Sequence, residues 1–352
     1  MTGLSCHLPH GELIGIHRRR RRRVIEIVVI LAIVAMLAVL LVRSTGVSLT
    51  IDHPIWLVIS IAFEFGSMAS FARVQRLALA TGGIRMTLWQ ALRITYASNA
   101  VSVTVPVGGS AAATANTIAE FRHEGADSGL VAWTLMTTGI ISTLAFAVIT
   151  ATGAVLSGSG AAATAGVATT LIGTVPVALV LLSVRRPVLR AQVAHFLGAV
   201  LRISWKIIGR PRNPNETAER LVNQFAVHHF SRFAGVKVLY FATMNWLLDA
   251  ACLGAVIAAF GQPVPWRFLF AIYATGVGAA AIGITPAGIG IVEVAIAAAL
   301  IRGGMASTYA FPAALTYRAI SCWLVMAVGW MFFTRSRRHL KNPHQHVVDS
   351  NA

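Results

Sequence analysis

A glutamate and an arginine stand in two of the most apolar parts of this sequence. Glu293 follows Gly290 within the apolar run 290–301, and Arg318 lies in the last apolar stretch. A charge among apolar residues is costly, so each should face a cavity or a partner. Glu293 can pair with Arg318, can cap the start of its own helix, or can do both. Because the arginine fork binds carboxylate and phosphate alike, the pair could form a gate or contact a headgroup.

Two segments of the chain look like distant copies of each other. Each has a Tyr-Ala-hydroxyl triplet, a break rich in Pro and Gly, an alanine-rich run and a closing glycine. The first comprises Tyr96-Ala97-Ser98, Pro106-Val107-Gly108-Gly109 and Gly125, and the second comprises Tyr273-Ala274-Thr275, Pro286-Ala287-Gly288-Ile289-Gly290 and Gly304. Paired breaks in the two halves of a membrane chain indicate a transport site. The alternative is chance similarity between Gly/Ala-rich helices.

Each break should leave free backbone N–H groups at the start of the helix that follows. Such N-termini suit an anion, above all a phosphate. Glycine lets a headgroup approach the backbone, or it merely makes a tight turn. Asn99 and Asn116 flank the first break and can bind a headgroup or satisfy the broken backbone. Glu64 and Asp249 lie inside apolar stretches, where an ionisable group is a functional candidate.

The composition indicates an all-α polytopic integral membrane protein. Hydrophobic residues make up 56 % and charged residues 12 % of the chain, which allows about six to eight transmembrane helices. The net charge of +17 lies in loops beside apolar stretches, which favours cytoplasmic retention of these loops over nucleic-acid binding. Three scattered cysteines form neither a disulfide framework nor a zinc site. No catalytic motif is recognisable, so we expect no enzyme, no cofactor and no metal.

The charges of the loops predict the topology. Residues 1–23 form a basic cytoplasmic N-terminus, residues 24–334 a membrane domain with a basic cytoplasmic loop at 185–237, and residues 335–352 a basic cytoplasmic tail. The expected spans are 24–42, 54–72, 128–152, 167–184, 238–260 and 311–333. The charges also favour two re-entrant hairpins that form an inverted repeat, 94–121 from the cytoplasm and 268–301 from outside. Alternatively, each segment is a full span followed by a half-helix.

Together these motifs resemble the lysylphosphatidylglycerol synthase transmembrane-region family, which includes the flippase half of the bacterial multiple peptide resistance factor. The resemblance covers most of the chain, and its most specific part is the block from Pro286 to Glu293. It implies a plasma-membrane protein that handles phospholipid or lipid-linked headgroups. The residues that match motif positions are Asn99, Pro106, Gly108, Gly109, Pro286, Gly288, Gly290, Glu293 and Arg318. Bifunctional members carry a soluble aminoacyl-transfer domain after the spans, whereas this chain stops at Ala352, so lysyl-lipid synthesis by this chain alone is not expected.

The sequence therefore favours a protein of lipid-flippase type in the plasma membrane. Its expected partner is an anionic phospholipid or a lipid-linked glycan, which it would translocate or handle. One alternative is a non-transporting accessory scaffold for a cell-envelope glycosyltransferase. A membrane-embedded transferase is a further alternative.

Overall fold

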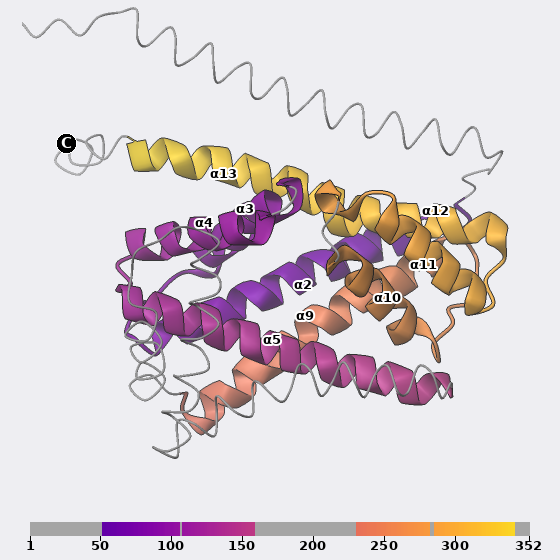
Figure 1. Cartoon of the computed structure of the whole chain (residues 1–352), viewed down its shortest axis with the longest axis horizontal. Coiled ribbons are helices and arrows are strands. Elements are labelled where there is room, and N and C mark those ends of the chain that lie inside the picture. The colour runs from indigo at the N-terminus through magenta and orange to yellow at the C-terminus, as the bar shows by residue number, and fades with distance from the viewer. Residues whose placement is uncertain (1–50, 106–107, 159–229, 282–284, 342–352) are drawn as a thin grey trace, which may run out of the picture. The chain divides into compact units, whose positions relative to one another are not determined.

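The computed structural model describes residues 51–105, 108–158, 230–281 and 285–341. This part of the chain is helical and contains no strand (Figure 1). The elements are α2 (Ile55–Ala80), α3 (Leu88–Thr104), α4 (Gly109–His123), α5 (Ser128–Ser157), α9 (Arg232–Ala259), α10 (Leu269–Ala281), the 3-10 turn η1 (Pro286–Gly288), α11 (Ile291–Arg302), α12 (Ser307–Arg318), the π-helical turn η2 (Ala319–Leu324) and α13 (Val325–Lys341).

Four helices of the described part are long and apolar enough to cross a bilayer. They are α2, α5, α9 and the continuous helix Ser307–Thr334, which runs through α12 and η2 into α13. The prediction of an all-α polytopic membrane protein is thereby confirmed. The expected spans 24–42 and 167–184, the terminus 1–23 and most of the basic loop 185–237 lie outside the described residues.

Two long helices extend beyond the spans that the sequence predicted. Helix α2 continues to Ala80 and so includes Arg73, and α9 begins at Arg232 and so includes Lys237. Both cations lie over aromatic rings, Arg73 over Phe241 at 5.4 Å and Lys237 over Phe233 at 4.4 Å. Long basic side chains can stay in a helix when their stems cover apolar surface, so a basic residue does not end the helix.

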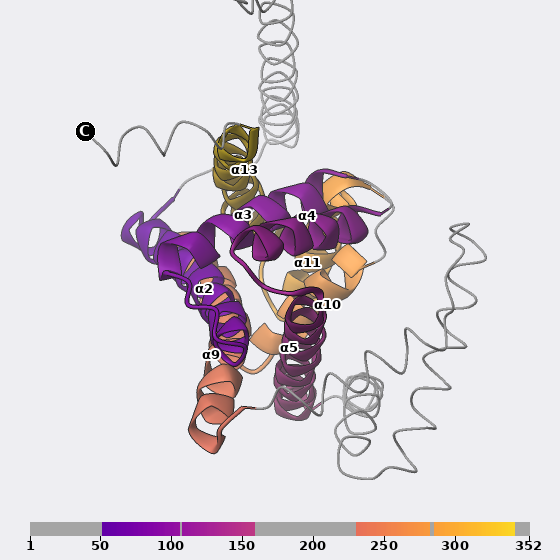
Figure 2. The ribbon, with the colours of Figure 1, turned by 90° about the vertical axis from the view of Figure 1, so that its left-hand side faces the viewer.

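Helices α2 and α9 form an antiparallel pair at the centre of the bundle. The N–H of His53, before α2, donates to the carbonyl of Ala259 at the end of α9, at 3.0 Å. Halfway along the pair, the Ser67 hydroxyl donates to the carbonyl of Asn245 at 2.8 Å. The two helices lie side by side in both views (Figures 1 and 2).

Each central helix is followed by a helical hairpin that closes on a glycine. The hairpins are α3–α4 and α10–η1–α11, and they end at Gly125 and Gly304, whose φ angles are 92° and 97°. In both, the second N–H after the last helical turn reaches back five residues, from Ala126 to Phe121 and from Met305 to Leu300, each at 3.0 Å. This hydrogen bond and the left-handed glycine are those of a Schellman ending. The similarity of the two segments therefore extends to their backbone geometry.

Packing between the two halves is reciprocal. Hairpin helix α3 packs against α13 of the second half, and α10 packs against α5 of the first half. Within the halves, α2 contacts α5, and α9 contacts α12. Both halves thus follow one plan, a long helix, a hairpin and a long helix. Because α2 and α9 are antiparallel, the two copies run in opposite directions, as expected for an inverted repeat.

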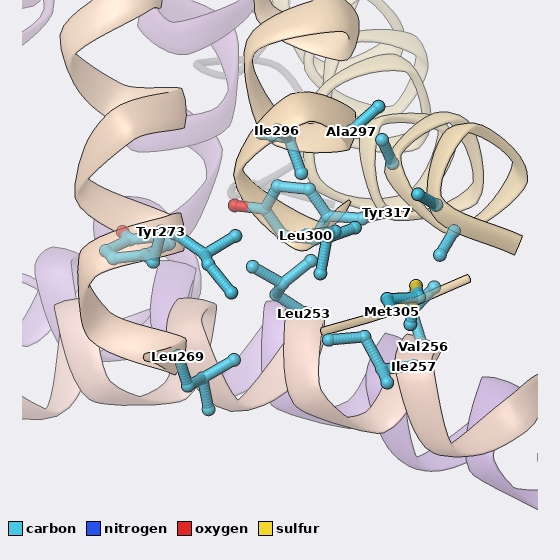
Figure 3. Packing of buried hydrophobic residues seen from close by; sticks show 14 of the residues in the cluster. Leu253, Val256, Ile257, Leu269, Tyr273, Ile296, Ala297, Leu300, Met305 and Tyr317 are labelled. Carbon is cyan, nitrogen blue, oxygen red and sulfur yellow. The ribbon is translucent and has the colours of Figure 1, made fainter. Parts of the chain in front are cut away.

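The largest buried cluster lies in the second half, between α9, α10, α11 and α12. Figure 3 shows Leu253, Tyr273, Leu300 and Tyr317 gathered in this cluster. A Cβ on Gly276 would lie 2.8 Å from the end of the Ile296 side chain, so glycine lets α10 and α11 approach closely. This packing fixes the second hairpin against the helix that carries Arg318.

Candidate functional site

The tip of the second hairpin is a tight turn with three residues in the left-handed region. Ala287 has a φ angle of 58°, Gly288 of 66° and Gly290 of 85°. The N–H of Gly288 donates to the carbonyl of Thr285 at 3.0 Å, and the N–H of Ile289 donates to the carbonyl of Pro286 at 3.1 Å. Left-handed backbone is uncommon for alanine and costs strain, which is a feature of functional turns.

Glu293 closes this turn and forms an ion pair. Its Oε2 accepts the N–H of Gly290 at 2.6 Å, and its Oε1 accepts the Nε–H of Arg318 at 3.2 Å. Both side chains are buried, with relative exposures of 3 % for Glu293 and 9 % for Arg318. The two roles considered for Glu293, helix cap and ion-pair partner, are therefore combined in one carboxylate.

Arg318 ties the turn to the last long helix. Its Nη2 donates to the carbonyl of Ala287, and its Nε donates to Glu293. Arg318 is the last residue of α12, directly before the π-helical turn η2. Such turns inside an α-helix are frequent at functional sites. The guanidinium thus holds a backbone carbonyl and a carboxylate, which leaves it suited to an anion of similar geometry.

In the first hairpin, neutral side chains join the two helices. The hydroxyls of Ser98 on α3 and Thr117 on α4 are hydrogen-bonded at 2.8 Å, and the Asn116 amide donates to Ser98 at 3.1 Å. A Cβ on Gly109 would meet the carbonyl oxygen of Ser102 at 2.1 Å, so the two helices approach here through glycine. Helix α3 also packs against η1, so the two hairpins touch.

The glycines of the two turns differ in what surrounds them. Gly108 (φ 99°) and Gly290 are exposed, and a Cβ built on either would have no described atom within 4 Å. A Cβ on Gly288 would lie 2.5 Å from Cγ2 of Val292, so Gly288 serves the packing of its own hairpin. Space for a headgroup beside the backbone is therefore present at Gly108 and Gly290.

The predicted site residues fall into two groups. Gly290, Glu293 and Arg318 are in contact, and Pro286 begins the turn beside them. Among the described residues, the hydrogen bonds of this ion pair do not include Asn99, Gly108 or Gly109. Asn99 is half-buried on α3, and Pro106 lies outside the described residues.

Sequence reasoning missed the partners of Asp249. On α9, Asp249 accepts hydrogen bonds from the hydroxyls of Tyr273 at 2.8 Å and Tyr317 at 2.7 Å. Glu64 of α2 lies beside Asp249. A clue was present, since Tyr273 heads the second repeated segment and Tyr317 precedes Arg318. What the sequence lacked was the antiparallel alignment of α2 and α9, which places Glu64 opposite Asp249.

Comparison with known proteins agrees with this architecture. Residues 23–329 match the family model described as the lysylphosphatidylglycerol synthase TM region. The matched range includes both hairpins, Glu293 and Arg318. The comparison with curated proteins gave no match.

Proposed function

Because the chain belongs to the family of lysylphosphatidylglycerol synthase transmembrane regions, we propose that it moves a phosphate-bearing lipid headgroup between the leaflets of the plasma membrane. The substrate is an anionic phospholipid or a lipid-linked glycan. The observation that carries this proposal is the buried Glu293–Arg318 pair at the broken hairpin. A charged pair inside an apolar bundle is costly and is retained where a polar substrate must pass.

In this proposal Glu293 occupies the place of the substrate's phosphate in the resting protein. Its two oxygens take the N–H of Gly290 and the Nε–H of Arg318. A phosphate offers oxygens with similar geometry and negative charge, so it can take both donors. The released N–H at the start of α11 also carries the partial positive charge of a helix N-terminus. A headgroup would thus displace Glu293. When the headgroup leaves, Glu293 and Arg318 would form their ion pair again.

The exposed glycines supply the route by which the headgroup reaches this pair. Gly108 and Gly290 stand at the tips of the two hairpins and have open space where a side chain would be. We take the hairpins to enter the membrane from opposite sides, because the copies run in opposite directions and cationic loops are kept in the cytoplasm. Both termini are then cytoplasmic. The net charge of +17 would draw anionic lipid to that face.

A headgroup-exposure assay tests the proposal. The purified protein is placed in liposomes that contain fluorescently labelled phosphatidylglycerol, phosphatidylcholine or a lipid-linked glycan, and a membrane-impermeant reductant bleaches the outer leaflet. We expect the wild type to increase the bleached fraction beyond one half for at least one of these lipids. Glu293→Gln should slow this movement, whereas Glu124→Gln should not, because Glu124 bonds Gln90 at the other hairpin. Bleaching limited to the outer leaflet with every lipid would overturn the proposal.

A further inference from the structure

A second polar cluster lies beside the ion pair, where α2, α9, α10 and α12 meet. Asp249 accepts the hydroxyls of Tyr273 and Tyr317 on its two oxygens. Glu64 of α2 lies opposite Asp249 in the antiparallel α2–α9 pair and interacts with it electrostatically. Glu64 is buried, with a relative exposure of 3 %, and its Oε2 has no hydrogen-bond partner among the described residues. A buried acceptor thus lies next to a second carboxyl group.

Two adjacent carboxylates repel each other in an apolar interior unless a proton or a cation lies between them. Arg318 is the only lysine or arginine buried in the described part of the chain, and it already binds Glu293. No group of three or more His, Cys, Asp and Glu that could hold a metal occurs among the described residues. A proton needs no ligands beyond the two carboxyl groups, so it is the simplest occupant of this pair.

We propose that Glu64 and Asp249 form a proton-binding site whose occupancy is coupled to headgroup binding at Arg318. This inference rests on the proposed function for its coupling, but not for the proton site itself. One proton is taken from one aqueous phase, is held between the two carboxyl groups, and is released to the opposite phase. With a headgroup that carries one negative charge, the combined movement transfers no net charge.

The groups that face this acid pair add little positive charge to it. They come from every element packed around the pair: Tyr96 on α3, Cys252 on α9, Tyr273 on α10, Tyr317 and Arg318 on α12, Cys322 on η2, and Glu293 across Arg318 on α11. Only Arg318 is a cation. The hydroxyl of Tyr96 is buried and, within the described residues, has no hydrogen-bond partner. It can therefore form a hydrogen bond with a carboxyl group that gains or loses a proton.

Coupling follows from the adjacency of Tyr317 and Arg318. Tyr317 binds Asp249, while Arg318 binds Glu293 at the hairpin and also attracts Asp249 electrostatically. Loss of the proton leaves one more negative charge beside Asp249, and this charge competes with a headgroup for Arg318. Proton and anionic headgroup therefore favour each other's binding, and the effect is reciprocal. They should move across the membrane in the same direction.

The proton site can be tested without any lipid movement. Infrared difference spectra of the purified protein between about pH 6, where ordinary carboxyl groups are already ionised, and alkaline pH should contain the C=O band of a protonated carboxylic acid. Glu64→Gln, which keeps the shape of the side chain, should remove this band, and Glu124→Gln should retain it. Tyr317→Phe removes one donor from Asp249 but keeps the packed ring, so the band should persist to a more alkaline pH. The variant Tyr317→Phe also tests the proton site if Glu64→Gln fails to fold. A spectrum unchanged by Glu64→Gln, or a response to sodium at fixed pH in place of the acid band, overturns the proton site.

The coupling is tested in liposomes that carry a pH gradient. For the wild type, labelled phosphatidylglycerol should move faster when the proton gradient and the lipid gradient have the same direction, by about 5-fold or more over the opposed arrangement. Glu64→Gln should lose this difference. An equal gradient response in the wild type and in Glu64→Gln overturns the coupling. An acid band that depends on Glu64, without lipid movement in the wild type, would keep the proton site and reject the proposed function.

Discussion

Gly329 on α13 lies directly against the carbonyl oxygen of Tyr96 on α3, where a Cβ on Gly329 would come within 2.1 Å of that oxygen. The same Cβ would lie 2.7 Å from Cβ of Ala100. Two backbones can approach this closely only through a residue without a side chain. The last long helix of the second half therefore packs directly against the hairpin of the first half.

This contact makes a stability prediction. Gly329→Ala should lower the free energy of unfolding by about 1–3 kcal/mol, because the added methyl group meets a backbone oxygen that cannot turn aside. Gly139→Ala is the matched control, since a Cβ at Gly139 meets no described atom within 4 Å, and alanine favours a helix over glycine by about 1 kcal/mol. Thermal unfolding in detergent measures both variants. Equal melting temperatures for Gly329→Ala and the wild type would contradict the close approach.

The ion pair of Glu293 and Arg318 predicts non-additive losses. Glu293→Gln and Arg318→Ala should each slow lipid movement more than they lower stability, because each removes one side of the proposed gate. The double variant should be little slower than either single variant, as expected of residues that act as one unit. Translocation rates at matched protein amounts in liposomes provide the measurement. Arg302→Ala, at the exposed end of α11, is the control. Strictly additive losses would leave Glu293 as a helix cap alone.

The open glycines at the hairpin tips predict a steric effect on transport. Gly290→Leu and Gly108→Leu should abolish lipid movement, because a bulky side chain would fill the space beside the backbone. Gly83→Leu controls for backbone strain, since Gly83 has a φ angle of 84° and equally open surroundings but lies in the link between α2 and α3. All three variants should lose similar stability, about 1–3 kcal/mol for a strained residue. If transport fell equally in all three, the tips would be turns without a role in the passage.

The charge pattern of the loops predicts which residues a reagent can reach from outside. Single cysteines at Gly158 and Arg302 should react with a membrane-impermeant maleimide in intact cells, and one at Arg122 should react only after permeabilisation. The background lacks Cys6, and the buried Cys252 and Cys322 serve as unreactive internal standards. Reaction at position 122 but not at 158 in intact cells would reject the re-entrant arrangement.

The class of protein and the ionic site could be predicted because both are encoded locally. Long apolar runs predict membrane helices, and Pro with Gly inside such a run predicts a break in the helix. Glu293 and Arg318 are isolated charged residues in apolar runs, so each had few possible partners of opposite charge. Their hydrogen bonds are those that the sequence suggested for Glu293.

The remaining features depend on residues that are distant in sequence. Nothing near Glu64 indicates that Asp249 lies beside it, because that contact follows from the antiparallel seating of α2 on α9. Gly329 looks like any glycine of an apolar helix until α3 is placed against it. For Gly288, headgroup contact stays a prediction, and the close approach of the Val292 side chain to it could not be predicted from the sequence. The substrate-binding role of Asn99 stays a prediction.

The π-helical turn Ala319–Leu324 sets the rotational register between the two parts of the last long helix. A π-helical turn holds one residue more than the α-helical turn it replaces, and one residue corresponds to about 100° of rotation around the helix axis. Arg318 stands on one side of the turn and Gly329 on the other. Rewinding the turn into α-helix would therefore rotate the Gly329 face away from Tyr96 while Arg318 kept its orientation. If a movement of Arg318 altered this turn, α13 would rotate and shift along α3. A change at the second hairpin would thereby reach the first hairpin through the last long helix.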